Sequence, residues 1–237
     1  NGHIENNHWQ LVPRSEVPPD AEVVPSVWAM RRKRNLTTNE ITKYKARLNM
    51  HGGKQTYGVN YYETFAPVVS WFGIRLLVVF AIVFHWSLRQ VDFVMAYPQA
   101  PIEEDMYMEL PKGIETSHSN SKDHVLMLLS NLYGQKQAGR VWNLHLVRKL
   151  IEIGFQQSQV DECLFYKGNA MYVLYTDDSI LVGPDEKELD QIIQEIAAAG
   201  LDITEEEGGL EDFLGVNIEK TSEGAYHLSQ PQLIEQI

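Results

Sequence analysis

The pattern of apolar and polar residues predicts short strands separated by a few helices. Apolar residues recur with helical spacing from Ser70, which can cap a helix, through Trp86, and again over residues 138–153, which Gly154 closes. The stretch "ELDQIIQEIAAAG" is amphipathic in the same way and ends at Gly200. We therefore expect three main helices.

Other apolar runs are bounded by turn residues and predict strands. "VWAMRRKR" and "EITKYKARL" flank the polar residues 35–39, a pattern typical of a hairpin. Single strands are expected at residues 88–92 and at "HVLMLL", and "FLGVNIEK" with "AYHLS" predicts a last hairpin. "AMYVLY" and "SILV" bracket residues 176–178 as a tight hairpin. Because no βαβ phosphate loop or repeat interrupts this alternation, the pattern favours an α+β sheet with helices on one face.

The first part of the chain lacks this patterning. Pro13, Pro18, Pro19 and Pro25 predict an extended lead-in, with the fold proper beginning near Val27. The chain begins without methionine and shows no signal-peptide pattern, so we expect a fragment of a longer polypeptide.

Composition indicates a folded chain. Its 237 residues, 44% of them hydrophobic, suffice for one sizeable globular unit or two subdomains. Cys163 is the only cysteine, which excludes an intramolecular disulfide and favours a reducing compartment. The longest apolar run, residues 76–84, is too short to span a bilayer, so we expect no membrane segment.

The formal net charge of −12 argues against a general nucleic-acid binder, but the charge is unevenly distributed. Residues 31–54 contain eight Lys or Arg and one acidic residue. Residues 185–223 contain thirteen Asp or Glu and two Lys, the pattern of a solvated outer face. A basic arm and an acidic far side therefore predict a polarised molecule.

Two adjacent carboxylates, Asp177 and Asp178, stand between apolar runs in "LYTDDSILV". An Asp-Asp pair is usually a polar turn. Both side chains can reach one site only if they sit at the turn, and a divalent cation would remove their mutual repulsion. Asp92, at a predicted strand end in "RQVDFVMAY", is the best third ligand. Its rivals, Asp161 and Glu162, fit an ordinary strand-entry turn equally well.

A strand-end acid followed by a strand-turn-strand Asp-Asp suits two-metal nucleotidyl transfer. Mg²⁺ prefers oxygen ligands and keeps coordination positions for phosphates. One ion activates the attacking 3′-hydroxyl and the other holds the triphosphate. We therefore expect two Mg²⁺ ions, with Mn²⁺ as an alternative. A metal-dependent phosphohydrolase is a weaker alternative, because the extra His or Asp ligands usual at such sites are missing.

Eight ordered motifs resemble the reverse transcriptase of copia-type LTR retrotransposons. They are "YKARLNMHGG", "YYETFAPVVSW", "VDFVMAYPQA", "MYMELPKGI", "NLYGQKQAGRVWN", "VDECLFYKG", "YTDDSILVG" and "FLGVNIE". The resemblance covers the chain from about Val27 to its end. It implies a right-hand polymerase with an antiparallel palm sheet. The implied segments are a lead-in at 1–26, fingers at 27–87, palm at 88–99, a fingers insertion at 100–137, palm at 138–223, and the palm end and truncated thumb at 224–237.

The resemblance also implies roles for particular residues. Asp92, Asp177 and Asp178 match the catalytic, metal-binding acids, with the backbone carbonyl of Phe93 as a further ligand and Asp178 as the least direct one. The implied deoxynucleotide-binding residues are Lys45, Arg47, Tyr97, Tyr133 and Gly134, and the implied primer grip is Phe213, Leu214 and Gly215. Tyr97 would abut the 2′ position of the sugar. Before the resemblance, a core tyrosine, a glycine turn and a solvated strand edge explain these residues as well.

Departures from the family pattern occur mainly in the fingers and palm end. His51 and Gly53 replace a basic and an aromatic residue, and Gly139 stands where many members have proline. No Lys, Arg or His lies between Glu188 and Ile218, where many polymerases have a lysine as general acid. Leaving-group protonation is therefore unassigned.

The resemblance implies an RNA-directed DNA polymerase that uses a template with primer and deoxynucleotides. The chain would belong to a pol polyprotein, with integrase upstream and RNase H downstream. Its expected location is a cytoplasmic virus-like particle, with a nuclear phase, and no membrane is involved. The alternative is a catalytically silent descendant retained for nucleic-acid binding or particle structure.

Overall fold

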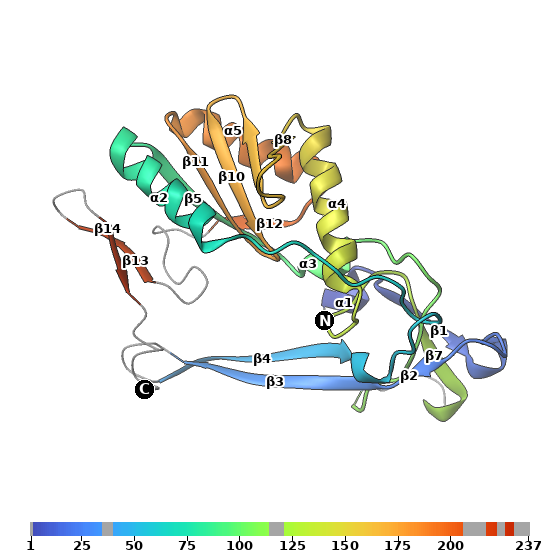
Figure 1. Ribbon diagram of the computed structural model, residues 1–237. Coiled ribbons are helices and arrows are strands. Elements are labelled where there is room, and N and C mark those ends of the chain that lie inside the picture. The colour runs from blue at the N-terminus through green and yellow to red at the C-terminus, as the bar shows by residue number, and fades with distance from the viewer. Residues whose placement is uncertain (1, 35–39, 114–120, 206–216, 222–225, 230–237) are drawn as a thin grey trace. The chain divides into compact units, whose positions relative to one another are not determined.

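The computed structural model describes residues 2–34, 40–113, 121–205, 217–221 and 226–229 (Figure 1). The chain forms two compact units. The first contains Asn1–Ala66 and Tyr97–Leu144, and the second contains Pro67–Ala96 and His145–Ile237. Each unit is therefore assembled from two separate parts of the chain.

The first unit contains a four-stranded sheet with the order β1-β7-β6-β2. Its elements are α1 (Gly2–Glu5), β1 (Trp9–Pro13), η1 (Arg14–Glu16), β2 (Val23–Val24), β6 (Tyr107–Glu109), η3 (Ser121–Asp123) and β7 (His124–Leu128). Strand β1 pairs antiparallel with β7 over its whole length, so the fold begins well before Val27. Trp9 and Leu11 are anchored because they pack against the buried cluster of this unit, and Pro13 is tolerated because β1 is an edge strand.

The predicted basic hairpin is confirmed. It consists of β3 (Ser26–Arg34) and β4 (Ile41–Met50), which pair antiparallel from Ser26 opposite Met50 outwards. Leu48 and Met50 are buried in the core of the first unit, whereas residues 41–46 are exposed. The hairpin is thus anchored at one end, where the η2 turn (Gly52–Lys54) follows it.

The second unit contains a six-stranded antiparallel sheet with the order β12-β5-β11-β10-β9-β8. Its strands are β5 (Ser87–Phe93), β8 (Gln156–Gln157), β9 (Leu164–Lys167), β10 (Ala170–Tyr175), β11 (Asp178–Gly183) and β12 (Ile203–Glu205). Its helices are α2 (Trp71–Phe84), α5 (Glu186–Ala198) and the last part of α4 (Ala138–Glu152), which begins in the first unit. The short α3 (Ala96–Gln99) begins with the last residue of the second unit's first part and continues in the first unit.

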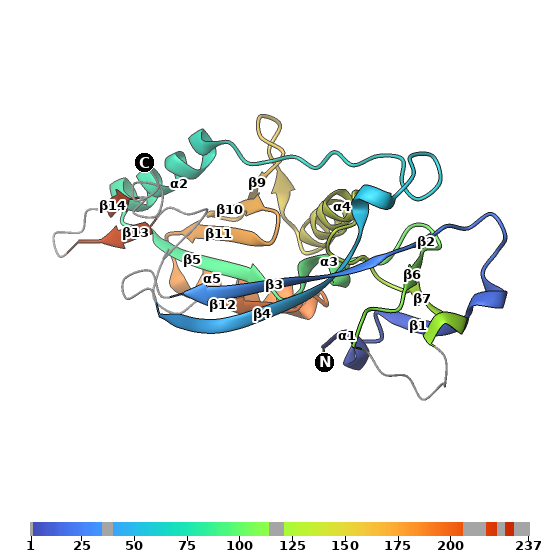
Figure 2. The ribbon, with the colours of Figure 1, turned by 90° about the horizontal axis from the view of Figure 1, so that it is seen from below.

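Helices cover both faces of this sheet, so the expectation of helices on one face is wrong. Val173, Ile180 and Val182 pack with α2 on one face. Gly183, on the other face, approaches Leu189 of α5. Figure 2 shows α2 and α5 on opposite sides of the strands. Residues 180–182 are all buried and apolar, because a strand covered on both faces does not alternate between apolar and polar residues.

The three predicted helices are confirmed, although α2 ends at Phe84, two residues before the predicted end at Trp86, and α5 begins at Glu186. The Ser70 hydroxyl caps α2 by accepting a hydrogen bond from the Gly73 amide at 3.1 Å. Gly154 and Gly200 adopt positive φ angles of 96° and 85° just after α4 and α5. The last predicted hairpin is also present, as β13 (Asn217–Lys220) paired with β14 (Tyr226–Ser229).

The chain therefore has mixed helix and strand content with mainly antiparallel sheets, as expected of an α+β fold. The predicted first fingers segment ran to residue 87, but helix α2 packs within the second unit. In the part of the chain that the structure describes, no helix is long and apolar enough to cross a membrane.

Candidate active site

The acidic pair lies at the connection of β10 to β11. Tyr175 pairs with Asp178, so Thr176 and Asp177 form a two-residue turn and Asp178 is the first residue of β11. Thr176 has a φ angle of 52°, which is rare for a β-branched residue and persists only where its surroundings enforce it. The hairpin is thus tight, as predicted, and its turn is strained.

Strand β5 brings the third acid to the same end of the sheet. Asp92 lies directly opposite Asp178 in the antiparallel pairing of β5 with β11. Residues paired in this way project from the same face, with Cβ atoms about 4.5–5.5 Å apart. The Phe93 amide donates a hydrogen bond to the Asp177 carbonyl oxygen at 3.2 Å, which ties the turn to the end of β5. The backbones of the three predicted acids therefore lie side by side, in one turn and at the end of one strand.

The donor types at this position suit Mg²⁺, because carboxylate and carbonyl oxygens are its preferred protein ligands. Asp92 and Asp178 share a face by register, and Asp177 is next to them in the turn. Among the residues that the structure describes, however, no three His, Cys, Asp or Glu side chains are already gathered as a metal-binding group. The types of these residues and their positions in the paired strands suit Mg²⁺. The complete ligand set, with the Phe93 carbonyl, stays a prediction.

The rival acid Asp161 has a structural role instead. One carboxylate oxygen of Asp161 accepts the Cys163 amide at 2.9 Å, and the other accepts the Ser70 hydroxyl at 3.2 Å. These bonds close the turn before β9 and fix the capping residue of α2. The neighbouring Glu162 is exposed, and its backbone carbonyl accepts a hydrogen bond from Gln157. The strand-entry interpretation therefore holds for Asp161.

Three of the predicted nucleotide-binding residues lie together in the first unit. The guanidinium carbon of Arg47 stands 4.7 Å from the centre of the Tyr133 ring, a cation–π distance. The ring of Tyr97 lies 4.8 Å from that of Tyr133, with 45° between the ring planes. A cation and two aromatic rings thus form one continuous group, the Arg47–Tyr133–Tyr97 stack.

The fourth residue, Gly134, is required by the backbone. It has a φ angle of 88°, and a Cβ atom on it would lie 2.2 Å from the carbonyl oxygen of Met50. A Cβ atom on Gly52 would likewise lie 2.0 Å from the Gly134 carbonyl oxygen. The segments around residues 50 and 134 therefore touch through their main chains, which only glycine permits.

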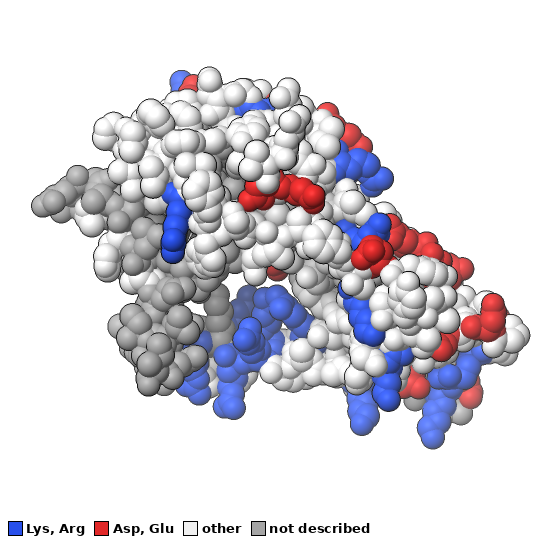
Figure 3. Space-filling model, in the orientation of Figure 1, with Lys and Arg blue, Asp and Glu red and all other residues white. Residues whose placement is uncertain are grey.

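Lys45, the fifth residue, lies apart from the stack. It is exposed, two residues from Arg47 along β4, and directly opposite Arg31 of β3. Lys and Arg side chains gather along this hairpin (Figure 3). The predicted primer-grip residues Phe213, Leu214 and Gly215 lie outside the described residues.

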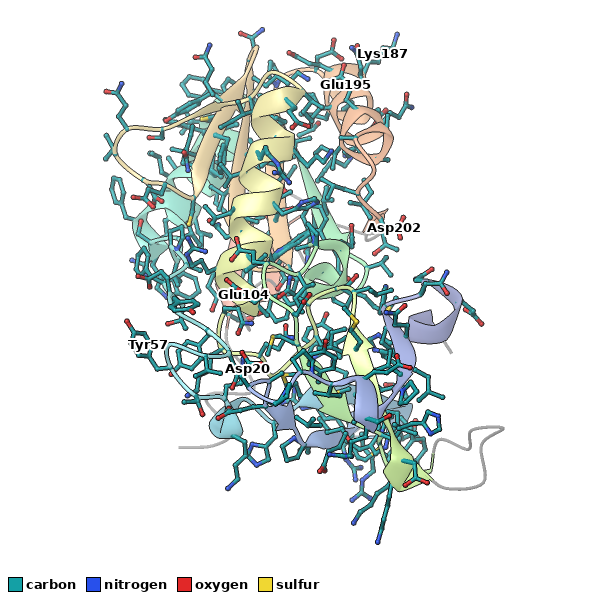
Figure 4. All side chains as sticks on the ribbon, turned by 90° about the vertical axis from the view of Figure 1, so that its right-hand side faces the viewer. Asp20, Tyr57, Glu104, Lys187, Glu195 and Asp202 are labelled. Carbon is teal, nitrogen blue, oxygen red and sulfur yellow. The ribbon has the colours of Figure 1, made fainter. Side chains whose placement is uncertain are left out.

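Strand β12 pairs with β5 on the side away from the acidic turn, and the general acid for the leaving group stays unassigned among the residues that the structure describes. Thr204 of β12 is the residue opposite Asp92 on the side away from β11. Figure 4 shows Asp202 in the segment that leads from α5 to β12, and its carbonyl oxygen accepts the Val94 amide at 2.9 Å. This bond attaches β12 to the chain just beyond Phe93.

Sequence reasoning missed the polar residues behind the stack. Gln55, Gln135 and Gln137 are all buried, although glutamine is mostly exposed in proteins. They lie in non-periodic segments, where side-chain spacing carries no signal of burial. The one hint in the sequence is the repeated glutamine of "GQKQ" after a loop glycine.

An acidic hairpin turn beside an acidic strand end is the class of site that polymerases use for metal-dependent nucleotidyl transfer. Residues 6–237 match the family described as reverse transcriptase (RNA-dependent DNA polymerase), and the chain belongs to this family. The resemblance inferred from the eight motifs is confirmed.

The similar curated proteins are Pol polyproteins of plant transposons. Those of transposons RE2 and RE1 from Arabidopsis thaliana are 33% and 34% identical over 97% and 99% of this chain. That of transposon TNT 1-94 from Nicotiana tabacum is 28% identical over 98% of the chain. The chain spans only 16–17% of the length of these relatives.

Proposed function

We propose that the chain is the catalytic part of an RNA-directed DNA polymerase, which adds deoxynucleotides to the 3′ end of a primer on an RNA or DNA template. The observation that carries this proposal is the register that sets Asp92 opposite Asp178, with Asp177 in the adjoining turn. Membership of the reverse transcriptase family supports it.

Asp92, Asp177, Asp178 and the Phe93 carbonyl would hold two Mg²⁺ ions, with Mn²⁺ as an alternative. These ions would neutralise phosphate charge and activate the primer 3′-hydroxyl. The role of the chain is positioning. The hydrogen bond from the Phe93 amide to Asp177 holds the turn against β5, so the carboxylates stay on one end of the sheet.

Residues of the first unit would bind the incoming nucleotide. Arg47 suits the triphosphate because a guanidinium is always charged and can form two parallel hydrogen bonds, and Lys45 adds a second cation on the same strand. Tyr97 would exclude a 2′-hydroxyl. The tight main-chain contact at Gly134 would place Tyr133 beneath the sugar.

The wider setting is also part of the proposal. The first unit would act mainly as fingers and the second as palm, and Phe213–Gly215 would form the primer grip. Because the relatives are Pol polyproteins, integrase would precede this chain and RNase H would follow it, within a cytoplasmic particle that has a nuclear phase. The alternative, a silent nucleic-acid-binding or particle-structural descendant, is less favoured because all three acids are present.

Primer extension tests the proposal directly. The chain is supplied with oligo(dT) annealed to poly(A), dTTP and Mg²⁺, and extension is compared with that of Asp92→Asn. Extension by the chain and none by the variant are expected. Binding of template-primer without extension, under Mg²⁺ or Mn²⁺, would instead identify the silent descendant.

A further inference from the structure

Two loops of the first unit are fastened together behind the Arg47–Tyr133–Tyr97 stack. The Met50 amide donates a hydrogen bond to the Tyr133 carbonyl oxygen at 2.9 Å. The close approaches at Gly52 and Gly134 press the same two segments together. Arg47 and Tyr133 therefore keep their spacing only while these loops stay aligned.

Gln55 bridges the two loops with both ends of its amide. Its side-chain oxygen accepts the Lys136 backbone amide at 2.8 Å, and its side-chain nitrogen donates to the Gln137 side-chain oxygen at 3.0 Å. Only 5% of Gln55 and 7% of Gln137 is exposed. Two hydrogen bonds from a buried planar group fix both the distance and the orientation of the loops.

The surrounding contacts complete this bridge. The ammonium group of Lys136 donates to the Tyr61 hydroxyl at 3.0 Å and stands 4.5 Å from the centre of the Tyr61 ring. The Gln137 amide also donates to the Asn60 carbonyl oxygen at 3.4 Å. Lys136 and Gln137, which follow Gly134 closely, are thereby attached to residues 55–61.

We infer that Gln55 is a positioning residue, which holds the main chain at Tyr133 and Gly134 in register with β4 so that the stack meets the incoming nucleotide correctly. This role rests on the proposed function, because it presumes that the stack contacts the nucleotide. Gln55 acts through the main chain, because its side-chain oxygen accepts the Lys136 backbone amide, two residues after Gly134.

Gln55→Met is the informative change, because methionine nearly preserves the volume and removes both hydrogen bonds. We expect KM for dTTP to rise about tenfold and the dTTP/UTP ratio of kcat/KM to fall about tenfold, with kcat changed less than about twofold. A ratio is insensitive to the fraction of folded enzyme. An unchanged ratio with a lowered melting temperature would show that Gln55 only stabilises the fold, and would overturn the inference.

The double variant Gln55→Met/Gln137→Met separates stability from position. It removes the Gln137 side-chain oxygen, which the single change leaves without a donor, so part of the lost melting temperature should be regained although the bond to the Asn60 carbonyl oxygen is also lost. The dTTP/UTP ratio should stay low, because the Lys136 amide still lacks its acceptor. Gln156→Met, at an exposed position of β8, is the matched control and should behave as the unaltered chain.

Hydrogen exchange tests the bridge without any activity. In Gln55→Met the amides of Met50 and Lys136 should exchange about tenfold faster, with β10 and β11 unchanged. Unaltered exchange at both amides would overturn the inference even if the enzyme is active. Failure of the unaltered chain to extend a primer would defeat the proposed function, whereas the exchange result would still decide whether Gln55 aligns the loops.

Discussion

Asp178, the first residue of β11, lies directly opposite Asp92 of β5. Like charges in directly opposed positions of an antiparallel pair destabilise the sheet. A divalent cation removes this repulsion and turns the same pair into a ligand set. The opposition of two acids at these strand ends is therefore consistent with the proposed metal-binding function.

Replacing Asp92 or Asp177 by Asn should abolish primer extension and leave the fold intact. Each change removes one negative charge and almost no volume, and the loss should be about 1,000-fold or more, equivalent to about 4 kcal/mol. Primer extension and circular dichroism measure the two effects. Asp190→Asn, on the exposed side of α5, is the control. Near-normal turnover by either active-site variant would show that the site is assigned incorrectly.

Asp161→Ala should have the opposite profile. It removes the acceptor of the Cys163 amide and of the Ser70 hydroxyl, so the free energy of unfolding should fall by about 1–2 kcal/mol. The specific activity of the folded protein should stay within about twofold of normal, since Asp161 is assigned no metal. Chemical denaturation and primer extension compare the two quantities. A loss of activity without a loss of stability would restore Asp161 as a metal ligand.

Local patterns explain which elements could be predicted. The hairpin of β3 and β4, the capped helix α2 and the tight turn at Asp177 each depend on residues close in sequence. The edge strand β1 was missed because its partner β7 is more than a hundred residues away. Helices on both faces were not predicted, because the lack of a βαβ phosphate loop does not show which faces of a sheet are covered, whereas the continuous apolar run at residues 180–182 does.

In the candidate site too, some features could be predicted from the sequence and others could not. The acids and the basic strand could be predicted from residue type and from resemblance. The register that opposes Asp92 and Asp178 could not, because 86 positions separate them. The bridge from Gln55 to Lys136 spans 81 positions and joins two loops, which leaves no periodic trace in the sequence.

Gly134 and Gly139 should respond oppositely to alanine. Gly134→Ala places a Cβ atom against the Met50 carbonyl oxygen at a positive φ angle, and should destabilise the fold by about 1–3 kcal/mol or more. Gly139→Ala lies in α4 with no contact closer than 3.9 Å, and should stabilise by about 0.5–1 kcal/mol. Thermal melts should show the two shifts in opposite directions. A tolerated Gly134→Ala would contradict the close main-chain contact.

Arg31→Gln and Lys45→Gln should each weaken template-primer binding and also reduce the salt dependence of that binding, because each removes one cation that contacts a phosphate. Each cation that contacts a phosphate contributes about 0.7–0.9 to the slope of log K against log salt concentration. Because Arg31 and Lys45 are directly opposed like charges, each change should also slightly raise the melting temperature. Fluorescence anisotropy over a salt series measures the slope. Lys187→Gln, on α5, should leave it unchanged (Figure 4), and an equal effect there would contradict a localised contact.

Tyr97→Ala should admit ribonucleotides. Selecting deoxyribose means rejecting one hydroxyl, which a rigid ring achieves by steric clash. Contact with the tilted ring of Tyr133, 4.8 Å away between ring centres, limits the movement of the Tyr97 ring. Its removal should improve UTP use relative to dTTP by about 100-fold, or about 2.7 kcal/mol of discrimination, with dTTP use much less affected.

Tyr97→Phe is the matched control for this gate, because it keeps the ring and loses only the hydroxyl. It should retain nearly all the discrimination, as measured by kcat/KM for dTTP and UTP. A tyrosine that only packs in the core would behave differently, since truncation to alanine would destabilise the protein by about 3–5 kcal/mol and leave the sugar preference unaltered. An unchanged dTTP/UTP ratio in Tyr97→Ala, with a large drop in melting temperature, would therefore exclude Tyr97 as the gate.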